Sequence, residues 1–118
     1  MSDNRIQEIL EKLKSIRGVH GSAIIERFGL VRGSALPGWI DEESVAAMVT
    51  LILKASQRAS KELEQGTFDS AIIESGKGRI LFDDIKDNII VVISDNSAKL
   101  GIVSLKLKAA VRELEKIL

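Results

Sequence analysis

The segment Asn88-Ile89-Ile90-Val91-Val92-Ile93-Ser94 carries five β-branched aliphatic residues in a row. Side chains alternate between the two faces of a strand, so a strand formed here would be apolar on both faces. Strands of this kind are covered on both sides. We therefore expect this one near the centre of a sheet, with helices on each face.

The rest of the chain divides into helices and strands around this segment. Apolar periodicity predicts three helices, over residues 3–17, 41–65 with Asp41 as cap, and 97–118 with Asn96 or Ser97 as cap. Alternating segments predict four further strands, over residues 22–26, 30–36, 67–74 and 79–82. The turns between strands are expected at 27–29, 76–78 and 83–87, the first of them allowed by Gly29. The order α-β-β-α-β-β-β-α predicts an α/β fold, a three-layer α-β-α sandwich with an antiparallel sheet.

Composition excludes several classes of function. The 118 residues include 17 basic and 17 acidic side chains and only 3% aromatic residues, whereas nucleic-acid binders need a basic excess or rings for stacking. Cysteine is absent, which excludes disulfides and thiolate metal sites and fits a reducing compartment. No apolar run approaches the roughly 20 residues of a membrane span. We expect a cytoplasmic protein that binds neither nucleic acid nor membrane.

The residues able to carry chemistry do not form a catalytic or ligand-binding set. His20 is the only histidine and has no second ligand for a metal and no nucleophile to serve. Asp83, Asp84 and Asp87 lack the spacing of a calcium loop and suit a turn. The basic glycine-rich segment 76–79 precedes a strand, whereas a phosphate loop precedes a helix. We expect no enzymatic activity, no cofactor and no metal.

The central helix has more apolar surface than one sheet can cover. A stripe at helical spacing is predicted to face the sheet: Val45, Met48, Val49, Ile52, Ala55, Ala59 and Leu63. A second apolar surface is confined to the first half of the helix: Ala46, Ala47, Thr50, Leu51 and Leu53. No segment of the chain is left to cover it, so the sequence predicts a second molecule there. The alternative is an alanine-rich surface that solvent tolerates.

The outer strands differ in how they discourage pairing with other strands. Residues 30–37 carry Arg32, Gly33 and Pro37, which protect an edge, whereas residues 67–74 contain neither lysine nor proline. If 67–74 forms an edge, it is free to pair with a copy of itself. We therefore expect a homodimer, whose interface adds Phe68, Ser70 and Ile72 to the second helix surface.

Four segments, GVHGSAII at 18–25, GLV at 29–31, DEESVAAM at 41–48 and LGIV at 100–103, resemble the Roadblock family of dynein light chains. The resemblance is to its prokaryotic MglB-like members and extends over essentially the full length. It implies a single domain of residues 1–118 with strand order 2-1-5-4-3, the third strand being the free edge. It also implies a homodimer in which that strand pairs with its symmetry mate and the central helices lie side by side.

The resemblance further implies a partner, a small Ras-like GTPase, which such a dimer serves as regulator or scaffold through its paired central helices. Candidate contacts are Trp39, Ile40, Arg32 and Arg58. Trp39 is either an anchor for the partner or a hydrophobic staple that folds back near Val45. The alternative function is a small-molecule-sensing or signalling module, which requires a pocket with convergent polar groups.

Overall fold

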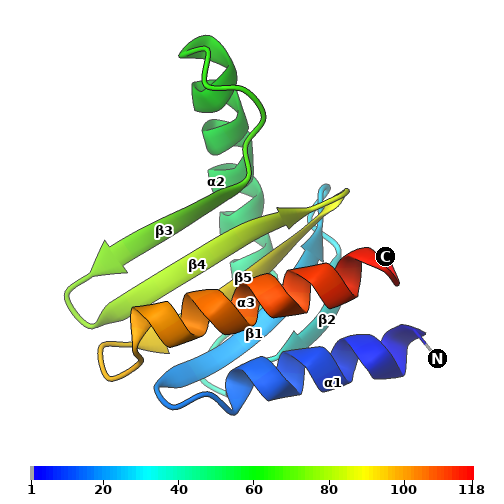
Figure 1. Ribbon diagram of the computed structural model, residues 1–118, viewed down its shortest axis with the longest axis vertical. Coiled ribbons are helices and arrows are strands. Elements are labelled where there is room, and N and C mark those ends of the chain that lie inside the picture. The colour runs from blue at the N-terminus through cyan, green and yellow to red at the C-terminus, as the bar shows by residue number, and fades with distance from the viewer. Residues whose placement is uncertain (1) are drawn as a thin grey trace.

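The computed structural model describes residues 2–118. Its elements in chain order are α1 (Ser2–Lys14), β1 (Val19–Glu26), β2 (Val31–Ala35), α2 (Glu42–Glu62), β3 (Ser70–Ser75), β4 (Gly78–Ile85), β5 (Asn88–Asp95) and α3 (Leu100–Glu115). The strands form one antiparallel sheet in the order β2-β1-β5-β4-β3 (Figure 1). The predicted class, element order and strand order are confirmed.

The apolar strand β5 lies in the middle of the sheet, as its sequence predicts. It pairs with β1 on one side and with β4 on the other. Ile90 and Val92 point into the core under α1 and α3, and Ile89 and Val91 point into the core under α2. Because helices cover both faces, the middle of this strand is apolar on both, and its polar residues Asn88, Ser94 and Asp95 lie at its ends.

Two separate cores hold the three layers together, with α1 and α3 on one face of the sheet and α2 on the other (Figure 1). The large helical side chains of the first core are at most 3% exposed: Ile6, Ile9, Leu10, Leu13, Val103, Leu107 and Leu114. The second core is smaller and packs the first turns of α2 against the sheet. The predicted three-layer sandwich is confirmed.

The long helix α2 crosses the sheet, and its last turns extend beyond β3 (Figure 1). Its buried residues are Val45, Ala46, Val49 and Leu53, and none lies in the last two turns of the helix. The predicted sheet-facing stripe is therefore wrong at four positions, which are exposed: Met48, Ala55, Ala59 and Leu63. The helix is rotated so that positions 45, 49 and 53 face the sheet, and within residues 2–118 no strand lies beneath its last turns (Figure 1).

Several predicted element ends also differ from the structure: β1 begins at Val19 and not at 22, β3 begins at Ser70 and not at 67, and α1 ends at Lys14 and not at 17. Two further differences change where polar residues lie. β4 continues to Ile85, so Asp83 lies in the strand, 5% exposed, where the Lys108 Nζ donates to its Oδ2 at 3.0 Å. This charged partner explains how a carboxylate is accommodated in a strand position under α3. α3 begins after Lys99 and not after an Asn96 or Ser97 cap, because the Ser97 N–H and hydroxyl donate to Asp95 instead.

The predicted cap of α2 is confirmed. The Ser44 N–H and hydroxyl donate to the Asp41 Oδ2 at 3.0 and 2.7 Å. Both bonds favour the charged carboxylate, so they hold the pKa of Asp41 below its ordinary value of 3.8.

We expect Asp41→Ala to lower the melting temperature at neutral pH, because the Ser44 N–H in the first turn of α2 loses its acceptor. Asp41→Asn keeps an acceptor but not the charge, so its melting temperature should lie between those of Asp41→Ala and the wild type. A lowered pKa means that the stabilisation is complete above pH 3.8 and is lost as the pH falls through the folded-state value. Thermal denaturation of both variants at neutral and strongly acidic pH measures this. An Asp41→Ala deficit that is equally large in acid contradicts a charged cap.

Candidate functional site

Exposed apolar side chains gather on the first half of α2 and on the adjacent β1–β2 turn. We call this surface the α2 face, and its members are the exposed Phe28, Leu30, Ala47, Met48 and Leu51, together with the half-buried Thr50. Phe28 is 91% exposed and Leu51 is 70% exposed. Contiguous apolar surface of this kind marks an interaction site more often than a solvated surface.

A shallow groove of about 660 Å³ runs between the turn and the helix within the α2 face. Gly29 has a φ of 95°, which allows the turn to fold tightly against Thr50. The Thr50 hydroxyl donates to the Ala46 carbonyl at 2.8 Å, so its hydrogen bond is made within the helix. Glu42 and Glu43 line the same groove. The site is an apolar groove with two carboxylates beside it.

β3 is an edge of the sheet, and within residues 2–118 it pairs with β4 alone. The Asp84 N–H donates to the Asp69 carbonyl at 2.9 Å, which identifies the odd-numbered residues as those bonded to β4. The backbone groups of Ser70, Ile72 and Glu74 therefore point away from β4. They form a row of free donors and acceptors that another strand can use.

The opposite edge, β2, is protected as predicted. Arg32 has no partner in the register between β1 and β2, so it forms a bulge in the edge strand. The Gln7 Nε2 of α1 donates to the Ser34 carbonyl at 2.9 Å and uses a backbone acceptor of this strand. Because β2 is protected and β3 is not, pairing with another strand is favoured at β3.

The residues predicted for the dimer interface fall in three places. Ala47, Thr50 and Leu51 are on the α2 face, and Ser70 and Ile72 are on the free edge of β3. The remaining three lie in the core under α2 and are at most 8% exposed: Ala46, Leu53 and Phe68. Side chains this buried have little surface to offer a second copy, although Ala46 lines the groove of the α2 face, so the dimer that we propose rests on the other five.

The residue in position to form a hydrophobic staple at the start of α2 is Ile40 and not Trp39. Ile40 immediately precedes the Asp41 cap, and it packs in the same core as Val45 in the first turn of α2. Trp39 is 71% exposed, and its ring meets the His20 ring edge-on with centroids 5.3 Å apart. Trp39 is therefore a largely exposed indole near the start of α2.

The two candidate arginines are not brought together within the protomer. Arg32 lies on β2 with its guanidinium 3.8 Å from Glu26, and Arg58 lies in the second half of α2, 2.8 Å from Glu62. β2 and β3 are opposite edges of the sheet, and the half of α2 that carries Arg58 projects past β3 (Figure 1). A single contact area cannot include both arginines of one protomer.

Sequence reasoning misses three members of the α2 face. Phe28 and Leu30 flank the turn glycine, and Met48 is predicted in the sheet-facing stripe. Two large apolar residues beside a turn glycine are a signal in themselves, because turns usually carry polar residues. The position of Met48 depends on the rotation of the helix, which the sequence does not specify.

The predicted acidic cluster is divided by the extra length of β4. Asp84 is a strand residue whose pKa is raised, first by burial, with Asp69 and Asp87 adding to the rise and Arg27 opposing it. Among residues 2–118 no group of three His, Cys, Asp or Glu side chains has an arrangement that could hold a metal ion. Within the same residues, no helix combines the length and the apolar character needed to cross a bilayer.

Comparison with known proteins gives the family. Residues 5–95 match the family model of the Roadblock/LC7 domain. Two uncharacterized proteins of Methanocaldococcus jannaschii are each 33% identical to the chain, over 93% of its length and 96% of theirs. The chain belongs to the Roadblock/LC7 domain family.

Among solved structures, the chain is similar to two MglB proteins. MglB of Myxococcus xanthus superposes with a TM-score of 0.92 at 25% identity, over 98% of this chain and 88% of that one. The gliding protein MglB of Thermus thermophilus gives a TM-score of 0.89 at 24% identity, over 99% of this chain and 90% of that one. The resemblance seen in the sequence is confirmed, and the fold is MglB-like.

Proposed function

We propose that the chain is a homodimer whose paired α2 helices form a docking surface for a small Ras-like GTPase, which it serves as regulator or scaffold. The observation that carries the proposal is the α2 face, where Phe28, Met48 and Leu51 are largely exposed and no other part of residues 2–118 covers them. Family membership supplies the class of partner, since MglB-like Roadblock proteins serve such GTPases. The unit we propose is one domain of residues 1–118 working in the cytoplasm.

The overhang of α2 supports the dimer. If a second copy pairs along β3, the last turns of α2 extend over the partner's sheet, because these turns project past β3 (Figure 1). Ala55, Ala59 and Leu63 continue an apolar stripe that has no sheet beneath it in the protomer. In the proposed dimer this stripe covers the other copy, which accounts for apolar residues where the protomer alone exposes them.

The proposed action on the GTPase is non-enzymatic. A partner that binds one arrangement of the GTPase switch segments more tightly shifts their population, and this requires no catalytic side chain. The small-molecule alternative has less support under α2, where the space lined by Val49, Leu53 and Phe68 does not admit even a water molecule. The core there is filled by the protein's own side chains.

A capture experiment from the source cell tests the proposal. Tagged wild-type protein is incubated with lysate containing either a GTP analogue or GDP, and retained proteins are identified by mass spectrometry. We expect a small Ras-like GTPase to be enriched in one of the two nucleotide states and to be lost with Leu51→Glu. If no such GTPase exceeds the untagged control in either state, the proposed partner class is wrong.

Trp39→Ala separates docking from stability. The indole is mostly exposed, so we expect the melting temperature to stay within a few degrees of wild type. If Trp39 anchors the GTPase, affinity should fall at least tenfold, or about 1.4 kcal/mol. Titration of the captured GTPase measures this. Unchanged affinity in a folded dimer moves the docking site elsewhere, with the exposed pair Ile102 and Leu105 on α3 as the next candidate.

A further inference from the structure

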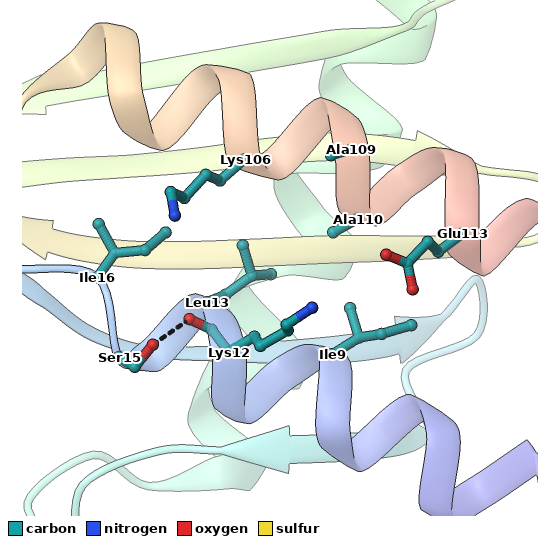
Figure 2. Close-up of a pocket in the computed structure, with 9 residues that line it drawn as sticks. All are labelled: Ile9, Lys12, Leu13, Ser15, Ile16, Lys106, Ala109, Ala110 and Glu113. Atoms are coloured by element: carbon teal, nitrogen blue, oxygen red, sulfur yellow. Dashed lines mark hydrogen bonds between the residues drawn. The ribbon is translucent and has the colours of Figure 1, made fainter.

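A groove between α1 and α3 lies on the face of the sheet opposite α2 (Figure 2). Its volume is about 360 Å³, and its apolar lining comes from Ile9, Leu13 and Ile16 of the α1 side and from Ala109 and Ala110 of α3. The two helices run in opposite directions (Figure 1) and the Arg5 guanidinium bonds the Glu113 carboxylate at 2.7 Å between them. The groove is therefore bounded by two helices that are linked at one end.

The charge of the groove is basic. Lys12 and Lys106 extend their side chains into the space from opposite helices (Figure 2), and within residues 2–118 neither takes part in an ion pair. The one carboxylate of the lining, Glu113, is neutralised by Arg5. A ligand lying along the apolar lining would meet an uncompensated ammonium group on each side, so carboxylates on its flanks are favoured.

The walls of the groove select the backbone conformation of a peptide occupant. Both walls are helices whose main-chain groups are bonded internally, and the Ser15 hydroxyl is bonded to the Lys12 carbonyl. An extended peptide would find no row of main-chain partners here, whereas a helix satisfies its own backbone. The α1 lining from Ile9 to Ser15 spans about two helical turns, roughly 10 Å, which suits one face of a short helix.

We propose that this groove is a second docking site, which binds an acidic amphipathic helix of another protein. The occupant carries apolar residues at helical spacing toward the partly exposed Ile16 and the exposed Ala109, and aspartate or glutamate on its flanks toward Lys12 and Lys106. The site lies on the opposite side of the sheet from the α2 face. The dimer and the GTPase site of the proposed function leave it accessible, and it does not depend on them.

A displayed library tests the proposal with the full chain. The probe is a stable three-helix bundle with one surface helix randomised, selected on wild-type protein and counter-selected on Ala109→Trp, which fills the groove from an exposed position. We expect enriched helices with apolar residues at positions i, i+3 or i+4, and i+7, flanked by aspartate or glutamate. The affinity of the best binder should fall at least tenfold in Ala109→Trp and in the double variant Lys12→Glu with Lys106→Glu.

The matched control is Lys77→Glu in the exposed β3–β4 turn, which makes the same type of substitution, with half the total change of charge, away from the groove and should leave the affinity unchanged. The lysine variants change only charge at exposed positions, so they test the proposal even if Ala109→Trp does not fold.

Three results overturn the proposal. The first is that the selected binders are basic or extended, or that none is sensitive to these substitutions. The second is that Ala109→Trp changes the oligomeric mass, which would make the groove an interface between copies. The third is binding of decanoate in the groove without any helix binder, which would identify a small amphiphilic acid as the occupant instead.

Discussion

Leu51→Glu is expected to be a monomer at micromolar concentrations at which the wild-type protein is a dimer. Leu51 is 70% exposed in the protomer, so a glutamate there should not disturb the fold. In the dimer the same carboxylate would be buried between two α2 helices without a partner charge, which costs several kcal/mol. Light scattering should give 12.9 kDa for the variant and twice 12.9 kDa for the wild type.

The matched control for this experiment lies on α3. Leu105 is 68% exposed, so Leu105→Glu makes the same chemical change at an equally exposed leucine away from the α2 face. It should keep the dimer mass. Thr50→Arg should also give a monomer, because it places a charge on α2 where the proposed dimer brings the two copies of this helix together. If Thr50→Arg and Leu51→Glu both keep the dimer mass, the α2 face is not the interface.

Ile72→Pro is expected to weaken the dimer at least tenfold while leaving the protomer folded. The Ile72 N–H points away from β4, so proline removes a donor from the free edge and not from the β3–β4 hairpin. The two-fold symmetry of the proposed dimer makes each lost interaction count twice. Sedimentation over a concentration series measures the dimer dissociation constant of the variant.

Ile72→Val is the control for the proline variant. Valine keeps the N–H and nearly the same apolar side chain, so the dissociation constant should stay near that of the wild type. Equal dissociation constants for Ile72→Pro and wild type would show that the β3 edge does not pair in the dimer. In that case the α2 face alone would have to hold the two copies together.

Much of the fold follows from local patterns. The apolar run in β5 places that strand in the middle, and the periodic Ile6, Leu10 and Leu13 identify the buried side of α1. These signals are strong because each arises from a face that is covered along its whole length. Asp83 is predicted in a turn because its place in the strand depends on a distant residue and not on a local pattern. The aspartate is accommodated in β4 because Lys108 of α3 donates to its carboxylate.

The candidate site is only partly readable from the sequence. Ala47 and Leu51 stand out because a helix that covers one sheet does not need apolar residues on its outer side. The prediction misplaces Leu53 because the rotation of α2 is set by the strands under it, and the helix is longer than the sheet beneath it (Figure 1). The groove between α1 and α3 depends on the spacing of two helices, which no local pattern specifies.

Isothermal titration of the captured GTPase into the protein tests most directly whether the paired α2 helices bind it. The titrant is loaded with a GTP analogue in one series and with GDP in another. We expect saturable binding to the wild-type dimer, stronger in one nucleotide state, and no measurable binding to the folded Leu51→Glu monomer. Equal binding to dimer and monomer, or no binding to a well-folded dimer in either state, would contradict a docking surface formed by the α2 pair.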